Sequence, residues 1–297
     1  MREFIAVQPG QRLDAFLLQQ CPGLAPGLLH KYLRENKIKV NGKKCPLSTR
    51  LAPGDRVRLY APENGLAART ALAVVYEDAA ALVVAKPAGL LTLDESGQTA
   101  DTLAARATAY LHGAPARACH RLDAGTSGLV VFAKTPAAEE QLTALIRKRQ
   151  LKKEYLCATF GHPAPASAVL HGYLVKDAAH GVVQVMQHAA PGAKEIVTRY
   201  ETLAVSGPLA LLQVELVTGR THQIRAHLAS IGCPLLGDDK YGNREANRRY
   251  KMRYPALCAW RLSFPTIPSG PCQGLTGKVL TVDKPWYAAQ ILQGTLR

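Results

Sequence analysis

The residues best placed to do chemistry lie together at 120–128, in the order His-Arg-Leu-Asp-Ala-Gly-Thr-Ser-Gly. Asp123 puts one carboxylate between a basic dipeptide and a glycine-rich turn, directly before the apolar run at 129–132. Loops that enter rigid strands often carry catalytic groups, and an aspartate beside arginine stays ionised at neutral pH. The same side chain could instead close an Asx-turn by accepting a hydrogen bond from the backbone two residues on. These residues alone therefore leave a catalytic acid and a turn residue as equal readings.

A second polar group lies at 218–228, where an alternating strand at 210–217 is expected to end and a helix at 221–231 to begin. Thr221 is placed to cap this helix. Its buried face is expected to carry Ile224, Leu228 and Ile231, with Gly232 ending it.

Three basic residues surround the expected start of that helix, namely Arg220, His222 and Arg225. Because the free N–H groups of a first helical turn also attract negative charge, this corner is suited to hold an anion, either a phosphate or Asp123. A capped helix with solvent-facing Arg and His would explain the same residues. No metal site is indicated, because His222 and His227 are five apart and the HExxH pattern is absent.

A third element is the basic run that enters a strand expected at 154–161, Lys152-Lys153-Glu154-Tyr155. A nucleic-acid base can stack on such a tyrosine, which contributes on the order of 1–3 kcal/mol per base. A single tyrosine in a strand can equally well be a core residue.

Charge narrows the class of partner. The 297 residues include 37 Lys+Arg and 22 Asp+Glu, a formal net charge of +15, which favours a polyanion such as nucleic acid. An anionic membrane is the rival partner, but no apolar run approaches the roughly 20 residues of a spanning helix, and the first residues contain no signal-peptide core. We therefore expect a cytoplasmic protein without a membrane partner. The seven cysteines are odd in number and form no CxxC pair, so neither a disulfide framework nor a zinc site is indicated.

The first 60 residues carry a large share of the charge, with eleven Lys+Arg and four Asp+Glu, a net +7. Apolar spacing predicts helices around 13–17 and 28–33, and a hairpin follows with Asn41-Gly42 at its turn. This segment resembles, over residues 8–60, the RNA-binding domain first described in ribosomal small-subunit protein S-four. Its cations are expected to contact phosphates, although a solvated basic face would use the same side chains; they are Lys31, Arg34, Lys37, Lys39, Lys43 and Lys44.

The rest of the chain is expected to form one larger domain at 71–297, after a Pro- and Gly-containing linker at 61–70. Strands are expected at 73–77, 81–86, 129–134, 154–161, 182–186, 195–204, 210–217 and 278–282, and helices at 100–111, 136–149 and 221–231. The predicted fold class is α+β: a small helix-hairpin RNA-binding domain, then a mixed, mainly antiparallel sheet with flanking helices.

Over about 70–265 the chain resembles the RluA/RluC/RluD-type pseudouridine synthases, which isomerise uridine in structured RNA. The residues that carry the resemblance are Tyr76-Glu-Asp, Leu82-Val-Val-Ala-Lys-Pro-Ala-Gly-Leu90, His120-Arg-Leu-Asp with Thr126-Ser-Gly-Leu, Lys153-Glu-Tyr155, Gly219-Arg-Thr-His-Gln-Ile-Arg225, Gly237-Asp with Tyr241-Gly242, and Ala259-Trp-Arg-Leu262.

The resemblance implies a role for each matching residue. Asp123 would be the catalytic carboxylate, Arg220 its ion-pair partner, and Tyr155 the ring that packs against the target base. Arg121 would enter the RNA stack and help to extrude the nucleotide, and His222 and Arg225 are further candidates for RNA contact. No cofactor or metal is implied, the substrate would be ribosomal RNA of the large subunit or else transfer RNA, and a monomer is the simplest state.

The sequence departs from the family pattern at two places, and two other functions compete with that of a synthase. Ala124-Gly125 follows the aspartate where charged or amide residues are common in the family, and Cys258 stands where histidine is expected. A noncatalytic RNA-binding or ribosome-assembly factor would use the same basic surfaces, including the cations of 243–253, without using Asp123. An aspartate-nucleophile hydrolase is disfavoured, because the chain lacks a DxDxT motif and a second acid placed to activate water.

Overall fold

The computed structural model describes residues 2–21, 24, 26–60, 72–94, 99, 101–177 and 181–296. Its internal contacts divide the chain into two units, one formed by Met1–Leu72 with Asp94–Tyr110 and the other by Ala73–Leu93 with Leu111–Arg297. The expected linker at 61–70 lies outside the described residues. The assignment of 1–60 and 71–297 as separate domains stays a prediction.

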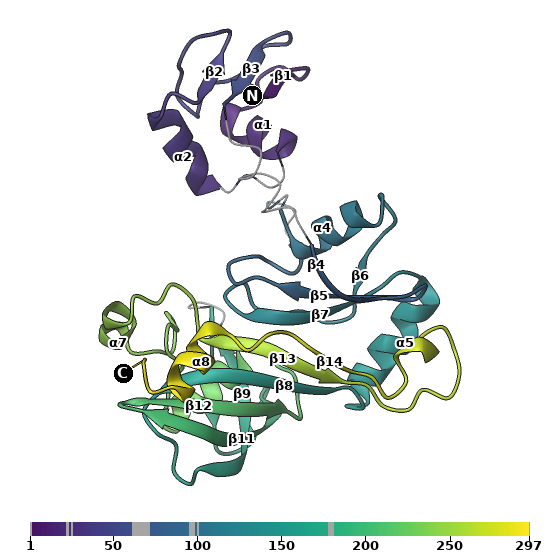
Figure 1. The fold of residues 1–297 in the computed structure, drawn as a ribbon, viewed down its shortest axis with the longest axis vertical. Helices are drawn as coiled ribbons and strands as arrows, with labels where there is room; N and C mark the ends of the chain where they lie inside the picture. Colours follow the sequence, from purple (N-terminus) through teal and green to yellow (C-terminus); the bar gives the residue numbers. More distant parts are fainter. Residues whose placement is uncertain are drawn as a thin grey trace. The chain divides into compact units, whose positions relative to one another are not determined.

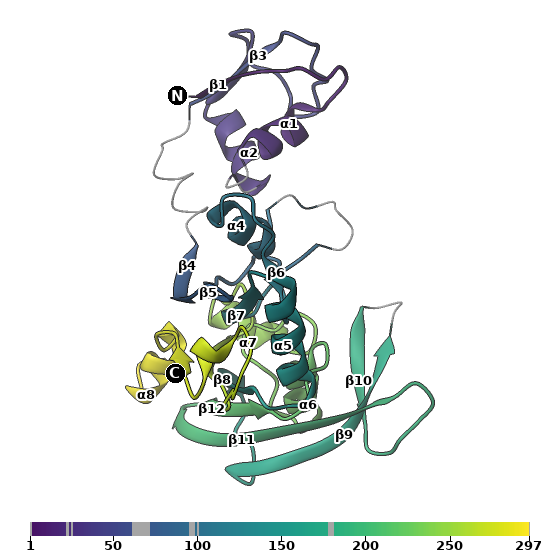
Figure 2. The same ribbon diagram turned by 90° about the vertical axis from the view of Figure 1, so that its right-hand side faces the viewer.

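The first unit contains a three-stranded sheet in the order β1-β3-β2. Its elements are β1 (Arg2–Ile5), α1 (Leu13–Gln20), α2 (Pro26–Arg34), β2 (Ile38–Val40), β3 (Arg56–Leu59) and, from the later segment, α4 (Leu103–Tyr110). Helices α1 and α2 lie on one side of this sheet (Figures 1 and 2). The apolar spacing of α1 explains its packing, because Leu13, Phe16 and Leu17 are all buried.

The turn after β2 has the geometry that its sequence predicts. Asn41 and Gly42 both have positive φ, 52° and 79°, and Val40 and Lys43 exchange backbone hydrogen bonds of 2.9 Å in both directions. This is the two-residue turn that Asn-Gly favours, because both residues tolerate the left-handed region. Strand β1, which pairs with β3, was not expected from the sequence.

The second unit is built on one large mixed sheet. Nine of its strands follow the order β10-β9-β11-β12-β8-β13-β7-β5-β4, with β14 paired to β13 and β6 to β7. The strands are β4 (Ala73–Glu77), β5 (Ala81–Lys86), β6 (Arg117–Ala118), β7 (Ser127–Ala133), β8 (Lys152–Phe160), β9 (Ser167–Asp177), β10 (Val182–Met186), β11 (Lys194–Ser206), β12 (Leu209–Leu216), β13 (Leu257–Ser263) and β14 (Val279–Thr281). The α+β class with a mixed, mainly antiparallel sheet is confirmed, whereas β6, β9 and β13 are additions to the expected strands.

Helical segments of this unit are α5 (Pro136–Arg147), α6 (Gln223–Ser230), α7 (Arg244–Arg249), η1 (Gln273–Leu275) and α8 (Trp286–Leu292). Helix α5 packs against β6 and β7, α6 against β10 and β11, and α8 against β8, β11 and β12. Thr135 caps α5 by accepting a hydrogen bond from the backbone N–H of Ala138, with Pro136 at the first position, as both residue types favour. Among the described residues, no helix is long and apolar enough to cross a membrane.

Strand β13 joins the two parts of the large sheet. It pairs in parallel with β7 through Cys258↔Ser127 and Ala259↔Gly128, and antiparallel with β8 on its other side. Gly128 has φ +112°, and a Cβ on it would collide with the backbone of Ala259. Only glycine permits this close approach, so the Gly-Leu-Val-Val sequence of β7 is suited to receive β13.

Candidate active site

A pocket of about 300 Å³ in the second unit collects residues from segments far apart in the sequence. Every catalytic candidate expected in this unit lines it, together with the expected RNA contacts near them: Arg121, Asp123, Tyr155, Arg220, His222 and Arg225. They come from the loop before β7, the start of β8, the segment that leads into α6 and the first turn of α6 itself. The sheet therefore brings together polar groups that lie about a hundred positions apart.

Backbone contacts fix the loop that carries Asp123. Lys86 is buried, with 2% of its surface exposed. Its ammonium donates to the carbonyl of Ala124 at 3.1 Å and to that of Leu90 at 2.7 Å. The N–H of Gly89 donates to the same Ala124 carbonyl at 2.7 Å. Burial lowers the pKa of Lys86 to about 8, against the opposing effect of the Asp123 charge. The loop after β5 thus holds the residue that directly follows Asp123.

The residue before Asp123 is held as well. The hydroxyl of Thr92 donates to the carbonyl of Leu122 at 2.9 Å and accepts from the N–H of the same residue at 3.1 Å. With both neighbours clamped, the Asp123 side chain projects from a rigid loop, 26% exposed. Its carboxylate faces Arg225 and His222, and in the described part of the chain it makes no Asx-turn hydrogen bond.

Arg225 is the arginine that reaches Asp123. Its Nη1 lies 3.4 Å from Asp123 Oδ2, while Nε and Nη2 bind Asp238 at 2.6 and 2.8 Å. Asp238 is fully buried and Arg225 is 7% exposed as a side chain. Burial alone would lower the pKa of Arg225, but the hydrogen bonds and charge of Asp238, with that of Asp123, raise it overall. Asp238 therefore fixes a cation beside Asp123.

Arg220 does not make the ion pair that the family resemblance implied. It is exposed, and within the described ranges no nitrogen of its side chain pairs with Asp123. Its backbone N–H donates to Gln223 at 3.1 Å, which leaves the side chain at the rim of the pocket. The physical reason is position: Arg220 precedes α6, whereas Arg225 is the third residue of the helix and is buried.

His222 lies on the other side of Asp123, with Nε2 3.8 Å from Oδ2. It precedes α6 in the left-handed conformation, φ 55°, so Thr221 is not the helix cap and no side chain caps this end. Nδ1 of His222 lies 2.9 Å from the Tyr241 hydroxyl, which accepts a 2.8 Å hydrogen bond from the N–H of Val183. Burial lowers the pKa of His222, although the Asp123 charge opposes this. When Tyr241 donates to Nδ1, the Nε2 hydrogen faces Asp123.

Other expectations for this helix are only partly met. Ile224 and Leu228 are buried at 3% and 0%, but Ile231 is 39% exposed because it lies beyond the last helical residue. The approach to α6 is held by Gln223, whose side chain binds Thr218 and Thr198 at 2.9 and 3.0 Å.

Tyr155 contributes a largely buried ring to the pocket, 5% exposed. Burial raises the pKa of its phenol, and the charge of Asp123 raises it further, so the hydroxyl remains protonated at neutral pH. Arg121 is exposed and also lines the pocket. Its neighbour His120 accepts a 3.2 Å hydrogen bond from the N–H of Val131, and burial, then the charge of Lys153, lowers its pKa to about 3. His120 is therefore a neutral structural anchor.

The cations expected to contact RNA in the first unit come from α2, β2 and the loops that follow them. Lys31, Arg34, Lys43 and Lys44 are exposed. Lys37 pairs with Glu35 at 2.6 Å, and the ammonium of Lys39 lies over the ring of Tyr60, 5.8 Å from its centroid. In the described residues no group of three or more His, Cys, Asp or Glu is arranged to hold a metal ion.

Sequence reasoning missed four residues that organise the pocket: Lys86, Asp238, Tyr241 and Gln223. All four belong to segments that carry the family resemblance, so the signal was present as motif membership. It could not reveal their distant partners, which lie as far as 58 positions away in the chain.

Comparison with known proteins gives a consistent result. Residues 80–230 match the family model described as RNA pseudouridylate synthase. The chain is 30% identical to a Vibrio parahaemolyticus protein named ribosomal large subunit pseudouridine synthase C, over 79% of this chain and 78% of that protein. It is 32% identical to a protein of the same name from Rickettsia felis, over 79% of this chain and 82% of that protein.

Two solved human structures are similar to this one. RNA Pseudouridylate Synthase Domain Containing 4 superimposes with a TM-score of 0.59 and 25% identity, over 75% of this chain and 92% of that one. RNA Pseudouridylate Synthase Domain Containing 1 gives a TM-score of 0.57 and 23% identity, over 76% of this chain and 95% of that one, which is a likeness of fold.

Proposed function

We propose, from the premise that this chain belongs to the RNA pseudouridylate synthase family and is an RNA pseudouridine synthase, that Asp123 is its catalytic carboxylate and large-subunit ribosomal RNA its substrate. The observation that carries the proposal is the Asp123–Arg225–Asp238 chain of charges at the wall of the pocket. A carboxylate held on a clamped loop, beside a buried cation and open to a pocket, is poised to act on a ligand there.

The reaction is an isomerisation within one nucleotide. The bond between C1′ of the ribose and N1 of uracil breaks, the base turns, and a bond forms between C1′ and C5. The proton of C5 is lost and N1 gains one, so the atoms balance without a cofactor. Asp123 would start this sequence, either by attacking C1′ or by removing the 2′-proton of the ribose.

The residues around Asp123 would divide the remaining tasks. Arg225 keeps a positive charge beside the carboxylate and, through Asp238, keeps it in place. The Tyr155 ring offers a buried surface against which the base can pack. Since C1′ and C5 are inaccessible in a stacked helix, the uridine must be extruded, and exposed Arg121 at the rim is positioned to fill the space it leaves.

Support for a ribosomal substrate comes from two sources. The relatives from Vibrio and Rickettsia are named for the large ribosomal subunit. The net charge of +15 suits a highly charged RNA, and the S-four-like segment supplies further cations that would contact phosphates. We expect the protein to act as a monomer in the cytoplasm, and transfer RNA remains the alternative substrate to test.

The test combines pseudouridine mapping with a single substitution. Carbodiimide-based sequencing of RNA from cells with and without this protein identifies the modified uridine, and a fragment containing it becomes the substrate in vitro. Asp123→Asn, which preserves shape and removes the charge, should abolish isomerisation and retain most RNA affinity, because phosphate contacts dominate binding. Turnover by Asp123→Asn would remove Asp123 from its role. Identical maps with and without the protein would contradict the assignment of a ribosomal RNA substrate.

A further inference from the structure

A second cavity, of about 350 Å³, adjoins the pocket of Asp123. It lies between the end of α5, the start of β8 and the segment that follows β12. The two hollows share a wall, because the same residues line both: Ile146, Lys153, Leu216, Gly219 and Arg220. The two hollows are therefore neighbours, and successive nucleotides of one strand could occupy both.

This cavity, which we call the cationic cavity, is lined by five cations and one acid. The cations are Arg147, Arg149, Lys152, Lys153 and Arg220, and the acid is Glu215. Glu215 is already engaged, since its carboxylate lies 2.8 Å from Arg199 and 3.8 Å from Lys152. The lining thus has an excess of positive charge that its own acid does not neutralise.

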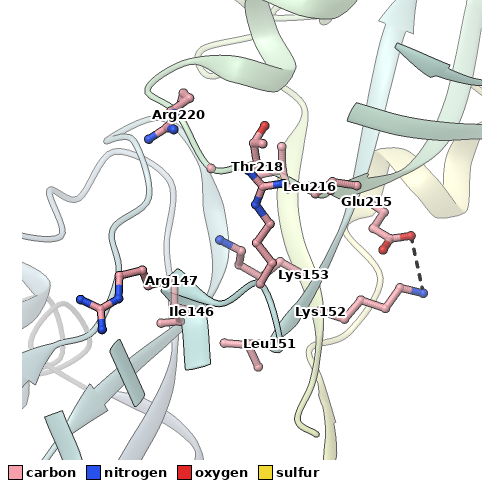
Figure 3. Close-up of a pocket in the computed structure, with 12 residues that line it drawn as sticks. Ile146, Arg147, Leu151, Lys152, Lys153, Glu215, Leu216, Thr218 and Arg220 are labelled. Carbon is pink, nitrogen blue, oxygen red and sulfur yellow. Dashed lines mark ion pairs between the residues drawn. The ribbon is translucent and has the colours of Figure 1, made fainter. Parts of the chain in front are cut away.

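The side chains divide into two groups (Figure 3). Lys152 turns toward Glu215, the pair joined by the dashed line, and also lies 3.4 Å from Glu154. Arg147 and Arg220 lie on the opposite side of the view from that pair, and Lys153 lies between the two sides. Within the described part of the chain, none of these three side chains makes an ion pair or side-chain hydrogen bond.

Lys153 is the most enclosed of the three. It is only partly exposed, and a Cβ built on Gly219 would lie 3.2 Å from its ammonium, so the nitrogen rests against the shared wall. Burial lowers its pKa, and no carboxylate counteracts this. A partly buried cation without a partner carries a desolvation cost, and a ligand of opposite charge in the cavity would offset that cost.

We infer that the cationic cavity binds the phosphate of a nucleotide next to the uridine held at Asp123, with Lys153 as its central contact and Arg147 at its margin. The inference rests on the proposed function, because it takes the ligand to be the RNA strand whose uridine enters the first pocket. It goes further by assigning the path of that strand. Phosphodiesters are the negative groups of such a strand, and lysine and arginine are their usual partners.

The test uses an RNA fragment centred on the mapped uridine and full-length protein carrying Asp123→Asn, so that binding is measured without turnover. Lys153→Met should weaken binding about tenfold and reduce the dependence of log affinity on log salt by about 0.7, the value for one single-strand phosphate contact. Lys148→Met is the matched control, because Lys148 is exposed on the same basic segment and lines neither hollow. It should change affinity much less than Lys153→Met does.

A second measurement locates the contact on the RNA. Neutral methylphosphonate groups replace the phosphates around the uridine, one at a time. One position should weaken binding to protein with Lys153 about tenfold and have little further effect on Lys153→Met. Arg147→Met, an exposed position whose change leaves the core intact, should show a smaller coupling at the same phosphate.

The outcomes separate the two proposals. If unmodified protein isomerises the uridine but no methylphosphonate couples to Lys153, the phosphate site is wrong and the proposed function stands. If no RNA is isomerised at all, the proposed function is wrong, and the phosphate site, which rests on it, is wrong with it. Inorganic phosphate is the probe for the rival occupant: saturable binding that Lys153→Met abolishes, without coupling to any RNA phosphate, would assign the cavity to a free anion and overturn the inference.

Discussion

Replacing Arg225 with lysine tests the charge arrangement at the proposed catalytic carboxylate. Arg225 binds Asp238 through two nitrogens, at 2.6 and 2.8 Å, and approaches Asp123 with a third at 3.4 Å. A lysine ammonium is a single point charge and cannot reproduce this three-way contact. Because Asp238 is fully buried and Asp123 is 26% exposed, the ammonium should stay with Asp238, where an unpaired charge would cost more.

The expected loss of activity follows from the lost contact between residue 225 and Asp123. A hydrogen bond to a charged group contributes about 1.5–3 kcal/mol, and each 1.4 kcal/mol or so is a factor of ten in rate. Arg225→Lys should therefore lower kcat about tenfold to a hundredfold. The loss of one of two bonds to Asp238 should also reduce the free energy of unfolding by about 1–2 kcal/mol.

Single-turnover isomerisation of the mapped RNA fragment measures the first effect, and urea denaturation the second. Arg220→Lys is the companion variant: since Arg220 is exposed at the rim, its kcat should stay near normal and any loss should appear in RNA affinity. A reversed result, in which Arg220→Lys abolishes kcat and Arg225→Lys does not, would refute the reasoning. It would mean that Arg220 moves onto Asp123 when RNA binds.

Two further predictions concern residues that support the pocket. Tyr241→Phe removes the hydroxyl that joins Val183 to His222, so we expect a loss of about 1 kcal/mol in the free energy of unfolding and a severalfold lower kcat, measured by denaturation and single-turnover assay; unchanged kcat would show that His222 needs no such support. Lys86→Met should destabilise the protein by about 3 kcal/mol near pH 7, because three carbonyls lose a donor. Folding lowers the pKa of Lys86 from 10.5 to about 8. Between pH 8 and 10.5 the unfolded chain therefore binds more protons than the folded one, and stability rises with pH. The free energy of unfolding of the unsubstituted protein, relative to that of Lys86→Met, should increase over this pH range. Denaturation curves at several pH values would check this, and a difference that shrinks as pH rises would contradict the assigned burial of Lys86.

The strands that a sequence predicts best here are those with continuous apolar runs or clear alternation. Strands β5 and β7 are buried along almost their whole length, and most of their residues are correspondingly Val, Leu and Ala. The burial of β9 alternates over most of its length, but the strand was missed because histidine, glycine and a final Lys-Asp interrupt its apolar residues in the sequence. Strand β13 was missed because its partners, β7 and β8, lie about a hundred or more residues earlier.

The arginine that lies beside Asp123 shows a second limit of prediction from the sequence. An amphipathic reading of α6 places Ile224 and Leu228 on the buried face and leaves Arg225 facing solvent. In the structure, Arg225, Ala226 and His227 are buried as well, because α6 packs against β10 and β11 and receives Asp238 from the following loop. Helix periodicity therefore revealed the apolar contacts but not the buried ion pair, which depends on a loop that local pattern does not place.

The central position of β13 has a consequence for how the protein is made. Asp123, Tyr155 and Arg225 are all synthesised before residue 257, yet the loop of Asp123 leads into β7 and Tyr155 lies on β8, and β13 is inserted between these two strands. While β13 is still inside the ribosome, the nascent chain cannot form the sheet that holds the Asp123 loop and Tyr155 together. The active site can thus form only late in translation. A shortened product that ends before β13 would contain every proposed catalytic side chain but not the sheet that positions them.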